Sequence, residues 1–273
     1  MPALLELFRQ TGIRATWATV AAVACEGWDE YHERAPKLPN YLDPHLHWNS
    51  AVERADPTGR LYFAPDLVSA VAGTPDQELG SHTFSHIYFR EPGCMRGDVE
   101  ADTTACAGFF TERFGRAPTS LAFPRNQVAF QDVLRNGGIR TWRANQDAWY
   151  HRATSASEET TLCRATRFTD SLANLGRRDS LVDATGAQRA SFFIRLNLSR
   201  ALWVLQRRRI TAEARAVPEG HALHVYCHPH NLGAEPKVSI SKLRELLESI
   251  REATRGELVS STMTEFHRSQ SHS

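Results

Sequence analysis

The chain has 273 residues, of which 41% are apolar, so it can bury a sizeable core and we expect one α/β domain. Its 32 basic and 31 acidic residues nearly cancel, which excludes a general electrostatic attraction to nucleic acid or anionic lipid. The five cysteines are scattered and form no CxxC pair, which argues against a disulfide framework or a zinc ribbon and favours the cytoplasm.

The amino-terminal residues predict neither a signal peptide nor a membrane span. After them the hydrophobic pattern alternates between helical and strand periods, which is typical of α/β proteins. In chain order we expect helix 4–12, strand 13–23, helix 65–72, strand 78–80, helix 98–114, strand 120–124, helix 128–136, strand 139–142, helix 201–217, strand 221–228, helix 239–254 and strand 258–260. This order predicts a parallel barrel or an open parallel sheet.

The stretch 143–190 is polar and has no steady period, and we interpret it as a loop-rich rim over the active face. We find no internal repeat or linker. The chain is therefore expected to form a single domain over 1–267, followed by a frayed tail at 268–273.

The segment ELGSHTFSH at 78–86 places His82 and His86 four positions apart, directly after the strand that ends at Gly80. Reacting groups in βα architectures gather at the carboxyl ends of strands. If the chain turns helically there, the two imidazoles share a face and can bind one zinc ion. This spacing is common by chance in a chain with 12 histidines, so ordinary polar histidines at a strand end are the alternative.

Two later strand ends also carry polar side chains. In PRN at 124–126, Arg125 could clamp a carboxylate or an oxyanion and Asn126 could orient an amide or a sugar hydroxyl; alternatively, the segment only turns the chain. In HVYCHPHNLG at 224–233, His228 and His230 point the same way if the backbone stays extended. A histidine there could act as a general acid, or could simply bond a backbone carbonyl.

Aromatic residues in TWRANQDAWY at 141–150 could form the wall of a sugar site, since carbohydrate rings pack on aromatic faces. Trp142 and Trp149 are the candidates, with packing in the core or rim as the alternative. The sequence contains no GxGxxG, P-loop, GxSxG or HExxH motif, so nucleotide-binding, lipase and zincin functions have no support.

Taken together, these stretches resemble the NodB-homology polysaccharide deacetylases, the carbohydrate esterase family 4 group. LLELFRQTGIRATWATV resembles the family's first helix and second strand, ELGSHTFSH its metal motif, and AFPRNQ and HVYCHPH its later motifs. The likeness covers most of 3–265 and is loose over 143–215. It implies a distorted (β/α) barrel and the metal-dependent removal of an acetyl group from an N-acetylated sugar, in polysaccharide or glycan-precursor metabolism.

The resemblance makes His82 and His86 ligands of Zn²⁺ or another divalent metal, and His228 the general acid. Arg125 follows Pro124, whereas the family's arginine precedes the proline.

The remaining candidates are expected to contact substrate. Two are the strand-end residues Asn126 and His230. The other two are implied by the resemblance: Asp147 and Trp149 stand near the family's Asp and Trp with a looser spacing.

The family opens with a strand that ends in two adjacent aspartates, a general base and the third metal ligand. No Asp-Asp pair occurs in this chain, and its first helix begins almost at Met1, so the first barrel strand is expected to be missing. A catalytic zinc site normally has three protein ligands. Either the sequence starts late, through a misplaced start or truncation, or the chain is a degenerate paralogue.

We expect a hydrolase of carbon–nitrogen bonds other than peptide bonds, acting on an N-acylated sugar or oligosaccharide. Neither nucleic acid nor a membrane is an expected partner. An inactive carbohydrate-binding or structural protein on the same scaffold is the alternative.

Overall fold

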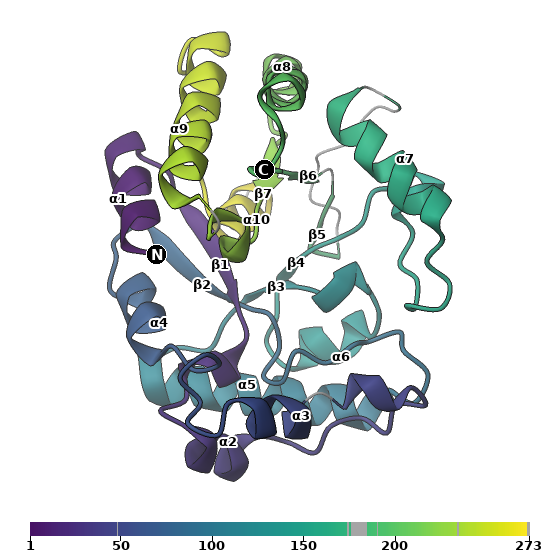
Figure 1. Ribbon diagram of the computed structural model, residues 1–273. Coiled ribbons are helices and arrows are strands. Elements are labelled where there is room, and N and C mark those ends of the chain that lie inside the picture. The colour runs from purple at the N-terminus through teal and green to yellow at the C-terminus, as the bar shows by residue number, and fades with distance from the viewer. Residues whose placement is uncertain (48, 174, 176–184, 190, 234, 272–273) are drawn as a thin grey trace.

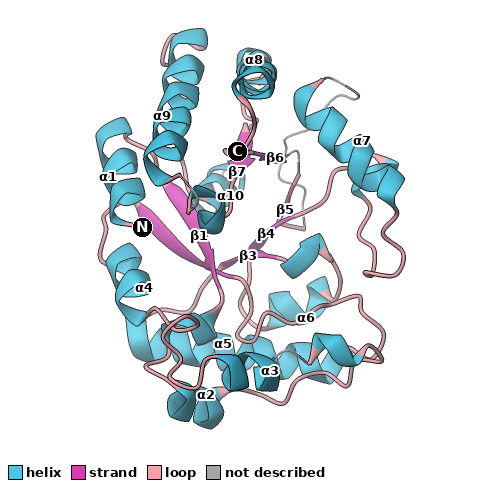
Figure 2. Cartoon of the chain, in the orientation of Figure 1, coloured by secondary structure: helices cyan, strands magenta, loops and turns pink. Residues whose placement is uncertain are grey.

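The computed structural model describes residues 1–47, 49–173, 175, 185–189, 191–233 and 235–271 (Figures 1 and 2). The helices are α1 (Pro2–Thr11), α2 (Trp28–Arg34), α3 (Asn49–Ala55), α4 (Pro65–Ala72), α5 (Arg96–Phe114), α6 (Gln131–Asn136), α7 (Thr161–Leu172), α8 (Arg200–Arg215), α9 (Pro236–Ala253) and α10 (Met263–Ser271). The strands are β1 (Ala15–Thr19), β2 (Gln77–Ser81), β3 (Ser120–Ala122), β4 (Thr141–Arg143), β5 (Ala187–Gln188), β6 (Ser191–Phe193) and β7 (His224–Tyr226). Within these ranges no helix is both long and apolar enough to cross a membrane.

The strands form two parallel sheets with helices around the outside (Figure 1). β1 to β5 lie in chain order in one sheet, and β6 pairs with β7 in the other. The expected α/β class and parallel sheet are confirmed. Barrel closure is not, because the described residues pair neither β5 with β6 nor β7 with β1. β1 is thus an edge strand, and all strands of the larger sheet end at the same side of it.

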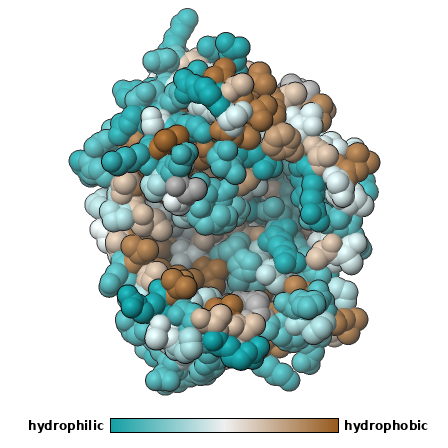
Figure 3. Space-filling view, in the orientation of Figure 1, coloured by the Kyte–Doolittle hydropathy of each residue, from teal (hydrophilic) through white to brown (hydrophobic). Residues whose placement is uncertain are grey.

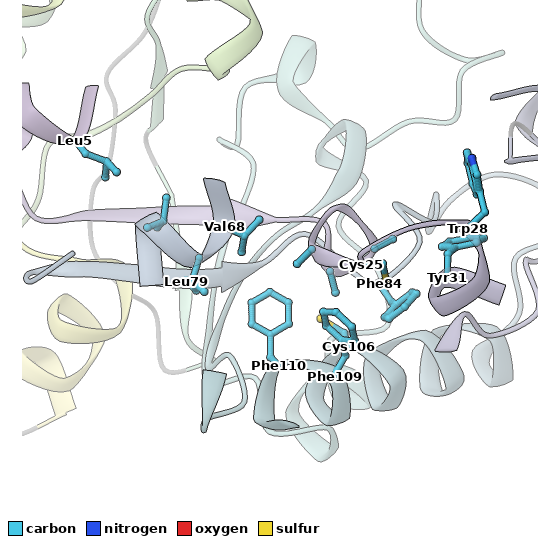
Figure 4. Close-up of a cluster of buried hydrophobic side chains, with 14 residues drawn as sticks. Leu5, Cys25, Trp28, Tyr31, Val68, Leu79, Phe84, Cys106, Phe109 and Phe110 are labelled. Carbon is cyan, nitrogen blue, oxygen red and sulfur yellow. The ribbon is translucent and has the colours of Figure 1, made fainter. Parts of the chain in front are cut away.

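Three apolar clusters hold the helices against the strands. α4 and α5 pack on β1 and β2, and the side chains of this cluster interdigitate around Phe84 and Phe109 (Figure 4). A second cluster joins α5 and α6 to β3 and β4, and a third joins α1, α8 and α9 to β6 and β7. Burial of these faces removes apolar surface from water, which is the main driving force of folding.

The amino ends of the strands converge on the carboxylate of Glu78. The hydroxyl groups of Thr16 and Ser120 donate to it over 2.6 Å and 2.7 Å, and the hydroxyl of Thr264 in α10 donates as well. The strands approach closely here: a Cβ at Gly80 would lie 2.7 Å from both Ser120 Oγ and Thr16 Cγ2, so only glycine fits. Glu78 therefore ties β1, β2, β3 and α10 together beneath the sheet.

Several expected elements differ from the structure. The strand expected over 13–23 ends at Thr19, and Ala21–Ala24 forms a 3-10 turn instead. The backbone N–H groups of Ala21 and Ala22 donate to the carbonyls of Thr83 and Phe84, so a tertiary contact overrides the strand propensity there.

The carboxyl-terminal expectations were also wrong in part. No strand forms at 258–260, because the Ser260 hydroxyl bonds both the N–H and the C=O of Arg14 in place of a backbone ladder. The tail expected to fray is helical through Ser271, within α10, and residues 272–273 lie outside the described residues. The expected loop-rich stretch 143–190 contains α7 and β5. The helix expected over 128–136 begins only at Gln131, because Phe130 has a left-handed φ of 52°.

Replacement of Glu78 tests its role beneath the sheet. We expect Glu78→Ala to lower the free energy of unfolding by about 2 to 4 kcal/mol, because the hydroxyls of Thr16 and Ser120 lose their acceptor. Urea denaturation monitored by circular dichroism measures the change. Glu100→Ala, at a half-exposed glutamate on α5 that pairs with Arg96, is the matched control and should stay within about 0.5 kcal/mol of the wild type. Equal losses in the two variants would contradict the role of Glu78.

Candidate functional site

His82 and His86 lie side by side at the carboxyl end of β2. Their ring centroids are 4.8 Å apart with an interplanar angle of 67°. The helical turn expected to bring them together is not formed: 82–86 is irregular, and Thr83 and His86 have left-handed φ values of 69° and 54°. The juxtaposition is as expected, but a strained loop rather than a helix produces it.

The loop between the two histidines is held by a buried carboxylate. Phe84 N–H donates to Asp102 Oδ1 over 2.7 Å, and Ser85 N–H donates to Oδ2 over 2.9 Å. Asp102 projects from α5 and is 1% exposed. Burial raises the pKa of Asp102 to about 6, while the two amide bonds act in the opposite direction.

The side chain of Phe84 anchors the same loop in the core. It is fully buried and meets the Phe109 ring edge-on at a centroid distance of 5.7 Å (Figure 4). Two independent attachments, one polar and one apolar, therefore fix the loop that carries the histidines.

The environment selects the neutral form of both imidazoles. His82 Nδ1 lies 2.6 Å from the carbonyl oxygen of Ala122, which can only accept, so Nδ1 carries the proton and Nε2 keeps its lone pair. Burial, followed by the nearby His86, lowers the pKa of His82 to about 3. Burial, followed by the charge of Arg125, lowers the pKa of His86 to about 4. Neutral imidazole is the form that binds metal ions.

The end of β3 brings Arg125 to the neighbourhood of His86. The Arg125 guanidinium lies 4.2 Å above the ring of Tyr88, which in turn meets the His86 ring edge-on at 5.3 Å. Glu91 Oε1 lies 3.6 Å from Arg125 Nη1. The conformation is unusual, since Arg125 and Asn126 are consecutive left-handed residues with φ of 51° and 56°. Such residues cost roughly 1 to 3 kcal/mol each and gather at functional sites.

The end of β7 faces this group from the smaller sheet. His228 and His230 stack with centroids 5.2 Å apart and an interplanar angle of 10°. The extended backbone expected to bring them together is not formed, because Pro229–Leu232 is a 3-10 turn. Desolvation by the surrounding protein lowers the pKa of His228, and the nearby His230 and Arg143 lower it further. Its charge is therefore linked to that of Arg143 on β4.

A pocket of about 270 Å³ opens beside His86 and is otherwise lined by apolar and aromatic side chains. The lining residues besides His86 are Val20, Val23, Tyr62 and Tyr88. The face viewed in Figure 3 is hollowed near its centre, and hydrophilic residues line much of the hollow.

Asp147 and Trp149 do not join this group. Asp147 accepts from Arg189 over 2.7 Å and lines a different pocket, of about 680 Å³, together with residues of α6 and β4. Trp149 is half-exposed and contacts the ring of Tyr150. Neither residue forms a hydrogen bond, ion pair or ring contact with a histidine of the site in the described part of the chain.

The donor set fits a divalent metal in type and falls short in number. His82 and His86 are neutral and lie next to each other. A backbone carbonyl also fixes the tautomer of His82, which is how metal-binding histidines are commonly oriented. However, the described residues contain no group of three His, Cys, Asp or Glu side chains placed to hold an ion. They supply two of the three protein ligands that catalytic zinc normally has.

Comparison with known proteins supports the fold. A proposed polysaccharide deacetylase from Mycobacterium smegmatis superposes over 99% of this chain and 77% of its own, with a TM-score of 0.57 and 13% sequence identity. A de-N-acetylase from Aggregatibacter actinomycetemcomitans aligns over 52% of this chain and 75% of its own, with 11% identity and a TM-score of 0.28, too low to carry an argument. No protein-family model and no curated protein sequence matches the chain.

The sequence left three important residues unassigned. Asp102 interrupts the buried face of α5 that Val99, Cys106 and Phe109 form, and a carboxylate in such a stripe is a signal that could have been read. Arg143 is likewise a charge within a buried strand. The position of Tyr88 beside His86 had no sequence signal, because it depends on the turn of the loop.

Removal of the Asp102 carboxylate tests the loop anchor. We expect Asp102→Ala to lower the free energy of unfolding by about 2 to 4 kcal/mol, because two buried amides lose their acceptor. Urea denaturation measures the loss, and amide hydrogen exchange should show faster exchange at Phe84 and Ser85. Thr104→Ala, at an exposed position of the same helix, is the control and should change neither quantity. Unchanged exchange at the two amides would refute the anchor.

The neutral state of His86 predicts a pH dependence of stability. An unfolded chain takes up a proton at this residue near pH 6.5, whereas the folded chain does so only near pH 4. The contribution is therefore fully present above pH 6.5 and is lost as the pH falls from 6.5 toward 4. Relative to His86→Gln, the wild type should lose stability over this window with an added slope of up to about 1.4 kcal/mol per pH unit.

Urea denaturation at pH values from 4.5 to 7 checks this slope. Tyr88→Phe keeps the ring beside His86 and serves as the control, with the slope of the wild type. Parallel curves for the wild type and His86→Gln would show that the folded protein binds this proton normally.

Proposed function

We propose that this protein is a hydrolase that removes an N-acyl group, such as acetyl, from a sugar in polysaccharide or glycan-precursor metabolism. The observation that carries the proposal is the neutral His82 and His86 pair at a strand end, with His228 on the neighbouring sheet. The likeness in fold to the Mycobacterium smegmatis protein supports it.

His82 and His86 would hold Zn²⁺ or another divalent cation through their unprotonated ring nitrogens. Such a cation, when bound, supplies a Lewis acid for the acyl carbonyl. The third protein ligand is not among the described residues. Every other role falls to side chains of the chain itself.

His228 is the proposed proton carrier. Its pKa is lowered, so its imidazole is neutral near pH 7. It can therefore accept a proton from the water that attacks the acyl carbon and then give that proton to the leaving amine. Arg125, whose charge lowers the pKa of His86, would stabilise negative charge that develops on the substrate.

The sugar would contact polar groups at the strand ends. Asn126 Oδ1 already accepts from Arg143 over 2.7 Å, which leaves the amide N–H donors of Asn126 for a substrate hydroxyl or amide. His230 extends the site by its stack on His228. Asp147 and Trp149 would act only on a longer oligosaccharide that reaches the second pocket.

A protein that binds carbohydrate without cleaving it is the second candidate. It is favoured by one observation, that the described residues provide two histidines and no third metal ligand. On this alternative the same strand ends bind the sugar, and the strained loops shape the cavity.

Metal content and acetate release separate the two candidates. We expect purified protein loaded with zinc and dialysed to retain about one ion per chain, measured by mass spectrometry, and to release acetate from an N-acetylglucosamine oligomer. His82→Ala and His86→Ala should lose the ion and lower acetate release by at least about 100-fold. His45→Ala, at an exposed histidine outside the site, is the control for both readouts.

The outcomes differ clearly. Oligomer binding without zinc retention or acetate release would support the non-catalytic candidate. Failure to bind the oligomer in any form would defeat both.

A further inference from the structure

Arg143 places a guanidinium between the two sheets, and the described residues give it no counter-charge. Arg143 is the last residue of β4 and its side chain is half-buried. Its Nη2 donates to Asn126 Oδ1 over 2.7 Å. Its other close partner is the face of the Tyr226 ring, 4.0 Å from the guanidinium carbon. Both partners are neutral, and no carboxylate of the described chain forms an ion pair with Arg143.

Besides the phenol of Tyr226, the ionisable groups that the charge of Arg143 reaches are histidines. Its charge lowers the pKa values of His82, His224 and His228, so its field reaches all three imidazoles. His224 is on the same strand as Tyr226, and its Nδ1 is buried without a hydrogen-bond partner. The interior therefore has a positive potential that no described acidic side chain offsets.

Partial removal of a charge from water is unfavourable unless a counter-charge offsets it, and a bound anion can supply that counter-charge. Burial accordingly lowers the pKa of Arg143. The guanidinium is also oriented in advance. Asn126 accepts from Nη2 and the Tyr226 ring packs on the plane of the guanidinium, while Nε and Nη1 form no hydrogen bond to a described residue. Nη2 carries a second N–H, which together with the N–H of Nε or of Nη1 on the same edge forms a fork for two oxygens of one anion.

We propose that Arg143 is the centre of an anion-binding site, and that the ligand that binds at these strand ends carries a carboxylate or phosphate group. The site deepens the proposed function and rests on it for the sugar part of the ligand. The anion contact itself requires no hydrolysis. Carboxylate and phosphate share the chemistry that the guanidinium recognises, and the experiment distinguishes them.

Calorimetric titration of the whole chain in EDTA tests the proposal. The ligands are N-acetylglucosamine, its counterpart with a carboxylate at C6, and inorganic phosphate. We expect the carboxylated sugar to bind at least about tenfold more tightly than the neutral sugar, as a charge-assisted bidentate contact provides. Competition between phosphate and the carboxylated sugar reports whether phosphate takes the same site.

Substitutions at Arg143 test whether this residue makes the contact with the anionic group. Arg143→Gln should remove the preference for the carboxylated sugar, and Arg143→Lys should retain only part of it, because lysine lacks the fork. Arg140→Gln, at an exposed arginine three residues earlier, is the matched control and should keep the full preference. Thermal unfolding confirms that each variant is folded.

Equal binding of the neutral and carboxylated sugars by the wild type would overturn the proposal, whatever the variants do. A preference for the carboxylated sugar that survives in Arg143→Gln would also overturn it. So would a preference that is absent in EDTA and appears only when zinc is added instead. Failure of acetate release with a retained preference would instead count against the proposed hydrolysis alone.

Discussion

The site depends on one buried carboxylate. Asp102 accepts the backbone N–H groups of Phe84 and Ser85, and thereby holds the chain between His82 and His86 in a shape that it would not adopt by itself. Thr83 has a left-handed φ, which is unfavourable for a β-branched residue. Two charge-assisted hydrogen bonds and the burial of Phe84 offset that strain. The two imidazoles meet because α5 is in place beneath them.

Strain and charge accumulate in the same place. Five of the seven non-glycine residues with positive φ in the described ranges lie in the loops that follow β2 and β3. Histidine and arginine side chains gather at the same strand ends, namely His82, His86, Arg125, Arg143 and His228. Backbone strain and unbalanced positive charge both lower stability, and their coincidence at the strand ends is typical of a site built for a ligand rather than for stability.

Much of the fold could be read from local patterns. The helix closed by Gly12 and the long helix closed by Gly115 form as expected, because a left-handed glycine ends a helix wherever the chain folds. The elements that failed depend on distant partners. Ser260 satisfies the backbone of Arg14 far along the chain, and the turn after Thr19 is set by bonds to the loop of the histidines. No local pattern contains such contacts.

The sequence by itself determined the alternation of strands and helices and pointed to His82, His86, Arg125 and His228, since side chains at the ends of parallel strands gather on one face. Only the tertiary structure decided which of them meet and in which state of charge. Desolvation depends on everything packed around a group, and so the neutral histidines became visible only in the folded chain. The same holds for Arg143, because its lack of a counter-charge among the described residues depends on which side chains the two sheets bring together.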